Sequence, residues 1–137
     1  MTRVNTIRIS IFSLGLIGAL YAGNAQAQQG AYSSLVASHA AAHGLPTSLV
    51  HRVIMRESRY NARAVSKGNY GIMQIRLGTA RAMGYRGDAA GLLDPNVNMT
   101  YAVKYLAGAY RAAGGNPDRA VAPYASGYGP GRSPYVS

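Results

Sequence analysis

The sequence predicts a mainly α-helical protein with one compact domain. Apolar side chains recur at helical spacing in its longest segments, glycine and proline separate those segments, and no section is rich in strand patterns. The 137 residues leave room for one domain, and a hydrophobic content of 48% is ordinary for a globular protein. The chain has no cysteine, so disulfides and thiolate zinc sites are excluded and helix packing must hold the fold.

The first 27 residues are typical of a secretory signal peptide. Arg3 and Arg8 give a positively charged start, an apolar run follows at residues 9–22, and Ala25-Gln26-Ala27 is a small-x-small cleavage site. The apolar run has about 14 residues, whereas a membrane-spanning helix needs ~20. We therefore expect cleavage of the leader rather than an uncleaved membrane anchor.

The mature protein is then expected to be periplasmic or secreted, without stable insertion in a membrane. Its domain covers residues 28–128, and the Gly-, Pro- and Ser-rich residues 129–137 form a loose tail. The net charge of +10 for the whole chain favours anionic partners. Because no nucleic-acid-binding motif is present, anionic polymers of the cell envelope are favoured over nucleic acid. A solvated basic surface without a partner is the alternative that charge alone leaves open.

Helix start and stop signals define the remaining elements. Residues 31–43 are alanine-rich and end at Gly44, and Pro46-Thr47-Ser48 begins a second helix that continues to Ser58. Further along the chain, Gly84 and Gly114-Gly115 each stop a helix, and Pro123 should end or distort the last one. The expected elements of this second part are an irregular polar segment at 59–70, a short apolar run at 71–75 that periodicity cannot classify, and helices at 79–83, 96–113 and 118–122.

Glu57 is the only glutamate in the sequence, and it lies on an apolar helix face. It follows Val53 by four residues and Ile54 by three, which places the three side chains together. Burial and the nearby C-terminal end of the helix both raise the pKa of a carboxyl group, as a general acid requires. Arg56 and Arg59 would lower it, but at helical spacing each points roughly 100° or more away. An ion pair between Glu57 and one of these arginines is the alternative.

The other carboxylates restrict the chemistry that Glu57 could perform. Most glycosidases use two carboxylates, and here the second would have to be Asp88, Asp94 or Asp118. Asp94 precedes a proline and Asp118 follows one, a context typical of turn or cap residues. A lone carboxylate suits a reaction in which the substrate supplies its own nucleophile.

The histidines do not predict a metal site. His39 and His43 are four residues apart on one expected helical face, but His51 is the only other imidazole. His51 and Ser58 are seven residues apart on one helix, too far for a hydrogen bond, so no catalytic triad is expected. We therefore expect neither a metal nor another cofactor. Tyr101 and Tyr105, at helical spacing, are expected in the core.

A series of short motifs runs through most of the expected domain. In chain order these are Glu57-Ser58, Asn61, Ala64, Ser66, Gly71-Ile72-Met73-Gln74-Ile75, Thr79-Ala80, Leu93-Asp94-Pro95, Asn98, Tyr105-Leu106, Gly114-Gly115-Asn116 and Ala122-Pro123-Tyr124. Any one block is a weak signal, whereas the ordered series is specific. On these residues the chain resembles the soluble lytic transglycosylases (SLT), which are related in fold to goose-type lysozyme, over roughly residues 35–128.

The resemblance implies a compact, lysozyme-like helical domain with a cleft for peptidoglycan glycan strands. Glu57 would protonate the oxygen that links N-acetylmuramic acid to N-acetylglucosamine. It would then deprotonate the C6 hydroxyl of the same muramoyl residue, which closes a 1,6-anhydro ring. The 2-acetamido group of the substrate would stabilise the intermediate, so no second carboxylate is required.

The same resemblance implies four residues on the substrate side of the site. Gln74 would line the cleft beside Glu57, and Met73 would form part of its wall, although core packing is an equal alternative for Met73. Ser58 would support the local geometry. The hydroxyl of Tyr124 would lie near Glu57, where a hydrogen bond can orient the carboxylate.

Three positions depart from the family pattern. The turn that precedes Gly71 is one residue shorter than usual, Arg76-Leu77 stands where Met-Pro is common, and Ala125 replaces the usual Asn. These differences favour altered subsites in the cleft.

Two alternatives to the lyase stay open at this point. A lysozyme-type hydrolase is the nearest, and a non-catalytic glycan-binding or secretion-assembly protein is the other. The size of the chain fits general wall turnover. It equally fits small family members that open the wall for a secretion or conjugation apparatus. Such an apparatus is therefore a candidate partner, and the protein itself is expected to be a monomer.

Overall fold

Helices form most of the computed structural model, which describes residues 14–126, with side chains from residue 26 to residue 125. The mainly α-helical prediction is confirmed. The first part of the expected signal peptide and the expected tail at 129–137 lie outside the described residues. The helical elements of the described chain are α1 (Leu14–Ala42), α2 (Thr47–Glu57), α3 (Leu77–Ala82), the 3-10 turn η1 (Ala90–Leu93), α4 (Pro95–Ala112) and α5 (Pro117–Ser126).

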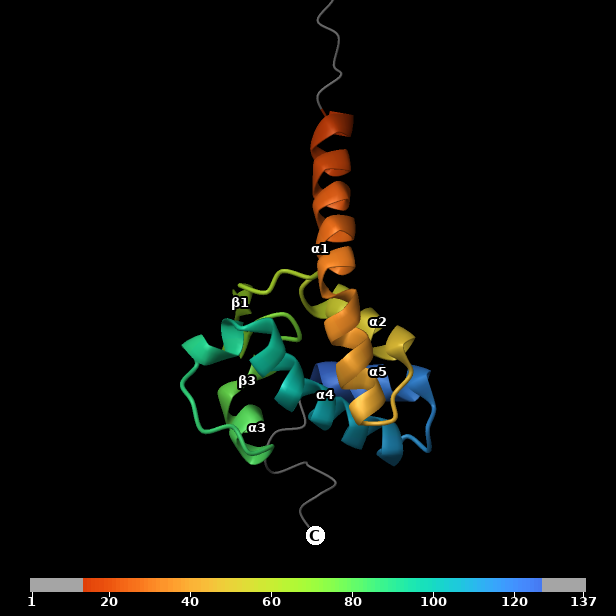
Figure 1. Ribbon diagram of the computed structural model, residues 1–137, viewed down its shortest axis with the longest axis vertical. Coiled ribbons are helices and arrows are strands. Elements are labelled where there is room, and N and C mark those ends of the chain that lie inside the picture. The colour runs from red at the N-terminus through yellow and green to blue at the C-terminus, as the bar shows by residue number, and fades with distance from the viewer. Residues whose placement is uncertain (1–13, 127–137) are drawn as a thin grey trace, which may run out of the picture.

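Helix α1 begins far earlier than the expected helix at 31–43. It is continuous from Leu14, because no proline separates the apolar run of the leader from the alanine-rich segment. Its first half stands away from the rest of the protein, and its second half packs against α2 and α4 (Figure 1). Tyr32, Leu35 and Val36 are its first side chains to reach the core. None of the helices within residues 14–126 has both the length and the apolar character needed to cross a membrane.

Helix α4 is the centre of the domain and contacts α1, α3, α5 and η1. It begins where predicted, because the Asp94 side chain caps it and Pro95 occupies its first turn. Helix α2 turns its apolar face toward the same core, and Pro46 precedes it without a side-chain cap. The buried residues of α2 and α4 are Leu49, Val50, Val53, Ile54, Asn98, Met99, Ala102, Val103, Tyr105, Leu106, Ala107, Gly108 and Ala109.

A small antiparallel sheet, which the sequence did not predict, joins α2 to α3. Its strands are β1 (Val65–Ser66), β2 (Asn69–Tyr70) and β3 (Ile75–Arg76), in the order β1-β2-β3. Only Lys67 and Gly68 connect β1 to β2, and both have positive φ angles, 52° and 77°. This is the geometry of a type I′ turn, whose twist matches that of a hairpin. The segment expected to be irregular therefore contains an ordered hairpin.

The loop between β2 and β3 is fixed by the fully buried side chain of Asn98. Its Oδ1 accepts a hydrogen bond from the Met73 N–H at 3.1 Å. Its Nδ2 donates to the carbonyl oxygens of Tyr70 and Leu92, both at 2.8 Å. At Gly71, where φ is 74°, an added Cβ would overlap the Leu92 carbonyl oxygen and the Asn98 side chain. Helix α4 thus holds this loop in one place.

Helix α5 does not end at Pro123. It continues to Ser126, so of the two effects expected of Pro123, an end of the helix is wrong. One face of the helix is buried, with Ala120 fully enclosed and Val121 and Tyr124 nearly so, and α5 packs on α2 and α4. We attribute the continuation to this packing, which outweighs the hydrogen bond that a proline cannot donate.

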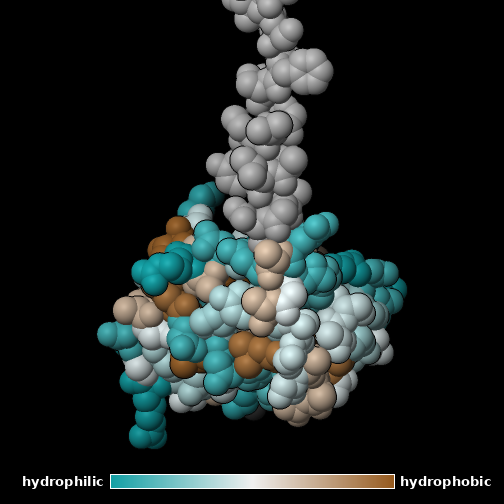
Figure 2. Space-filling model, turned by 45° about the horizontal axis from the view of Figure 1, so that its top comes forward, coloured by the Kyte–Doolittle hydropathy of each residue, from teal (hydrophilic) through white to brown (hydrophobic). Residues whose placement is uncertain are grey.

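The surface shows few large apolar side chains among the described residues. On the face seen in Figure 2, apolar residues form small patches separated by hydrophilic ones. Val65 is the one large apolar side chain that is exposed in the part of the chain between residues 26 and 125. The other large apolar side chains described are at least partly buried.

Candidate active site

A cleft with a volume of about 100 Å³ opens at the C-terminal end of α2. Its walls come from the end of α2, the small sheet, α3, and the facing helices α4 and α5. Segments far apart in the sequence thus meet at one site. The residues that line the cleft are Glu57, Asn69, Gln74, Ile75, Arg76, Thr79, Tyr105, Tyr124 and Ala125.

Glu57 is the last residue of α2 and is half-buried in this cleft. Burial raises the pKa of its carboxyl group above the usual value of 4.5, and the Arg56 guanidinium opposes the shift. Desolvation dominates, as expected from the apolar face of the helix. The alternative of an ion pair with a neighbouring arginine is not what the structure has, because the ion pair found within the described residues joins Arg52 to Asp118.

Ser58 and Gln74 connect the end of α2 to the sheet. The Ser58 hydroxyl donates a hydrogen bond to the Ile72 carbonyl oxygen at 2.6 Å. Gln74 has a positive φ of 51°, and its Nε2 donates to the carbonyl oxygens of Ala64 and Gly71, both at 2.9 Å. Because both amide hydrogens are used, the carbonyl oxygen of the Gln74 side chain is the group left to accept a hydrogen bond from a ligand.

Tyr124 lines the cleft together with Glu57, but its hydroxyl is hydrogen-bonded to Met73 and not to the carboxylate. Its hydroxyl donates to the Met73 carbonyl oxygen at 2.7 Å, and it has one hydrogen to give. Burial raises the pKa of this hydroxyl well above 10, with smaller contributions from Glu57 and Tyr105, so it remains a donor. The Met73 side chain is fully buried in the core and does not line the cleft. Met73 is therefore connected to the site through its backbone carbonyl oxygen, which accepts the hydrogen bond from Tyr124.

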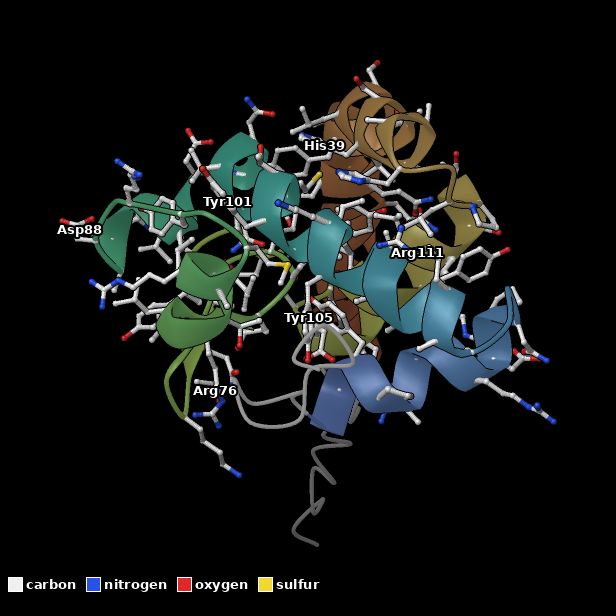
Figure 3. All side chains as sticks on the ribbon, turned by 90° about the horizontal axis from the view of Figure 1, so that it is seen from below. His39, Arg76, Asp88, Tyr101, Tyr105 and Arg111 are labelled. Atoms are coloured by element: carbon white, nitrogen blue, oxygen red, sulfur yellow. The ribbon has the colours of Figure 1, made fainter. Side chains whose placement is uncertain are left out.

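The three aspartates are engaged outside the cleft. Asp94 accepts from a backbone N–H in the first turn of α4 at 3.0 Å, and Asp88 accepts from one in η1 at 2.9 Å. Asp118 pairs with Arg52 at 2.7 Å, and Asn116 rather than Asp118 accepts from the first N–H groups of α5. Figure 3 places Asp88 at the outer edge of the molecule. Within the described residues, Glu57 is thus the carboxylate of the cleft.

Two of the three histidines have hydrogen-bond partners outside the cleft. His39 Nε2 lies 2.8 Å from Asn96 Oδ1, and His51 Nδ1 lies 2.7 Å from the Tyr60 hydroxyl. Among residues 14–126, no three side chains of the metal-binding types come together. His51 and Ser58 are not hydrogen-bonded to each other. His51 is bonded to Tyr60, and the Ser58 hydroxyl is bonded to the Ile72 carbonyl oxygen in the loop between β2 and β3.

Several cleft residues were not predicted as site residues. Tyr105 was expected in the core; it is only 5% exposed, yet it also lines the cleft, where its ring lies 5.5 Å from that of Tyr124. Figure 3 shows Tyr105 near the middle of the molecule, on α4. Asn69 lies in the segment that was expected to be irregular, and Thr79 was named only as part of a motif. Arg76 and Ala125, two of the departures from the family pattern, line the cleft as well.

A mainly α-helical domain whose cleft carries one half-buried glutamate is a lysozyme-like domain. The family model described as the transglycosylase SLT domain matches residues 34–134, and the chain belongs to this family. Its members are typically lytic transglycosylases that act on peptidoglycan. The match begins at Ser34, close to the first side chains of α1 that pack in the core.

Proposed function

We propose that the protein is a peptidoglycan lytic transglycosylase in which Glu57 acts first as the acid and then as the base. It cleaves the β-1,4 bond between N-acetylmuramic acid and N-acetylglucosamine and forms a 1,6-anhydromuramoyl end. The main support is Glu57, which is half-buried in the cleft and has a raised pKa. The three aspartates are bound to backbone N–H groups or to Arg52 outside the cleft. One carboxylate is sufficient for this reaction, whereas most glycoside hydrolases require two.

The reaction is balanced with Glu57 alone. Protonated Glu57 gives its proton to the glycosidic oxygen as the bond from that oxygen to C1 breaks. The 2-acetamido oxygen of the muramoyl residue stabilises the positive charge that remains at C1. The Glu57 carboxylate then takes the proton of the C6 hydroxyl while O6 attacks C1 and closes the anhydro ring. Glu57 is protonated again at the end, and no water is consumed.

The surroundings of Glu57 suit both roles. An acid that later acts as a base works best with a pKa near the working pH, and burial shifts Glu57 in that direction. The loop between β2 and β3 is held at the cleft by two hydrogen bonds. Ser58 donates to the Ile72 carbonyl oxygen, and Tyr124 donates to the Met73 carbonyl oxygen. The free carbonyl oxygen of Gln74 can accept from a sugar hydroxyl or an acetamido N–H. These contacts support a cleft that holds a glycan in a fixed position.

Digestion of purified sacculi followed by mass spectrometry tests the proposal. The wild-type protein is expected to release muropeptides with 1,6-anhydro ends, and Glu57→Gln to lose at least about 100-fold in rate, a typical contribution of a general acid. Asp118→Asn is the matched control, because it makes the same carboxylate-to-amide change at an exposed ion pair outside the cleft. This control should digest at close to the wild-type rate.

The products also separate the alternatives. Reducing ends without anhydro ends would overturn the lyase in favour of a lysozyme-type hydrolase. Sacculus binding without any product, the same for wild type and Glu57→Gln, would favour the non-catalytic glycan-binding protein. Equal product yields from wild type and Glu57→Gln would remove Glu57 from the catalytic role.

A further inference from the structure

The sheet side of the cleft carries an arginine without a carboxylate partner among the described residues. Arg76 in β3 has an exposed side chain and lines the cleft. Its Nη1 lies 3.8 Å from the position that a Cβ on Gly68 would take, so the guanidinium extends over the hairpin turn. Lys67, the other residue of that turn, is also exposed. Figure 3 shows Arg76 projecting outward beside the sheet.

The Arg76 side chain neither forms an ion pair with a described residue nor shifts the pKa of Glu57. It makes no ion pair with a described carboxylate, since Asp118 pairs with Arg52 and the other two aspartates accept from backbone N–H groups. It does not act on the pKa of Glu57 either, because the arginine that opposes burial there is Arg56. Its charge is therefore available to a ligand in the cleft.

We propose that Arg76, with Lys67 beside it, binds a carboxylate on the 3-O-lactyl substituent of the muramoyl residue in the cleft. This inference rests on the proposed function, because it assumes that the cleft holds a peptidoglycan strand. The two alternating sugars carry no charge apart from the lactyl substituent. The negative charge that a cation in this cleft could bind therefore lies on the lactyl branch. A guanidinium is suited to the task because its planar fork binds both oxygens of a carboxylate.

Two forms of the substrate offer this chemistry. In a strand without stem peptides, each lactyl group ends in its own carboxylate. In a strand with stem peptides, the lactyl group continues as an amide into a peptide that carries carboxylates. Both sources put negative charge on the same branch of the sugar, at different distances from the ring.

Binding to a protein that cannot turn over separates these sources. The Glu57→Gln protein and its Arg76→Met derivative are titrated with glycan strands that bear stem peptides and with strands freed of them by an amidase. Each preparation is used native and after carbodiimide conversion of its carboxylates to amides. Arg76→Met is expected to weaken binding of native strands about three- to tenfold, which is the size of a partly exposed ion pair or charged hydrogen bond. Binding of amidated strands should not change, which also reports that the variant is folded.

Two further variants sharpen the test. Arg76→Lys should keep part of the binding to native strands, because it retains the charge and loses the fork. Arg81→Met is the matched control, since Arg81 is exposed on α3 and does not line the cleft. It should bind all four preparations like the parent protein.

Each outcome has one meaning. A loss confined to stem-bearing strands supports the inference and assigns the stem carboxylates, whereas a loss on stem-free strands supports it and assigns the lactyl carboxylate. No loss on either native preparation, or an equal loss on the amidated ones, overturns it. The proposed function is tested separately by the anhydro products of the protein with Glu57 intact. Anhydro products together with carboxylate-independent binding would therefore reject the role of Arg76 alone.

Discussion

Glu57 couples the stability of the protein to pH in an unusual direction. Its pKa is raised in the folded state, mainly by burial, so the folded protein holds this proton more tightly than the unfolded chain does. The stability contribution of Glu57 is therefore fully present below its unfolded pKa of about 4.5 and is lost as the pH rises through the raised folded value. A paired surface carboxylate behaves in the opposite way.

Replacing Glu57 by glutamine should remove this pH-dependent loss. We expect Glu57→Gln to gain free energy of unfolding relative to the wild type when the pH is raised from 4 to 7, although it loses activity. Denaturant titrations of both proteins at the two pH values measure the difference, and the other titrating groups cancel in the comparison. If the difference between the two proteins is the same at pH 4 and pH 7, burial of the charged carboxylate does not cost stability.

Tyr124 acts on the site through the Met73 carbonyl oxygen. Tyr124→Phe removes the 2.7 Å hydrogen bond and leaves that buried oxygen without its donor, which should cost about 1–2 kcal/mol in unfolding free energy. Activity should fall severalfold while the pH at which it is half-maximal stays in place. Thermal or chemical unfolding and a pH–rate profile give the two readouts.

The control for Tyr124 is Tyr101→Phe, a half-buried tyrosine on α4 that packs against Tyr85. It should change the unfolding free energy by well under 1 kcal/mol, because no hydrogen bond of its hydroxyl is found among the described residues. A shifted pH profile in Tyr124→Phe would instead mean that the hydroxyl acts directly on Glu57.

Among the elements, the loop between β2 and β3 depends on a glycine. Gly71 has a φ of 74°, and an added methyl would overlap the Leu92 carbonyl oxygen and the Asn98 side chain. Gly71→Ala should therefore destabilise the protein by ~3 kcal/mol or more. Gly78, in helix α3, is the matched control, because its φ is not positive and no atom lies near an added Cβ. Gly78→Ala should stabilise the protein by about 0.5–1 kcal/mol.

Denaturant midpoints and slopes of the two alanine variants give the comparison. Similar shifts in the two variants would mean that the loop can move away from α4. In that case the three hydrogen bonds of Asn98 would not fix the backbone next to the cleft.

The helices could be predicted because their signals are local. Spacing, caps and stop residues placed helices at 79–83 and 96–113, and α3 and α4 lie at 77–82 and 95–112. The strands have two residues each, too few to show a period, and their pairing depends on the positive φ angles of Lys67 and Gly68. The early start of α1 was missed because nothing in the sequence marks a helix boundary between the leader and the domain.

The candidate site was likewise predictable only where its signal is local to one helix. Glu57 was found because its own helix reveals the apolar face on which it lies. Tyr105 reaches the cleft only because α4 and α5 face each other, and Tyr124 bonds to Met73 only because Asn98 fixes that loop. Such contacts arise from tertiary packing, which spacing along one segment does not contain.

For the molecule as a whole, contacts between α1 and the core begin well inside the helix. Each described side chain from residue 26 to residue 31 is exposed, and Tyr32 is the first to pack against the core. The expected signal peptide could therefore be removed without loss of a described core contact. The family match also starts inside this helix, at Ser34, and it ends at residue 134.

We expect the signal peptide to be cleaved after Ala27. The exported protein should have Gln28 as its first residue, as determined by intact mass or N-terminal sequencing of the cell-envelope fraction. A chain that begins at Gln28 should unfold within about 0.5 kcal/mol of the full chain and release the same anhydro products, since surface residues contribute little. A chain that begins at Ala37 loses Tyr32, Leu35 and Val36 from the core and should be destabilised by ~3 kcal/mol or more. Recovery of the intact leader on the exported protein, or unfolding of the Gln28 form, would show that the first half of α1 belongs to the working domain.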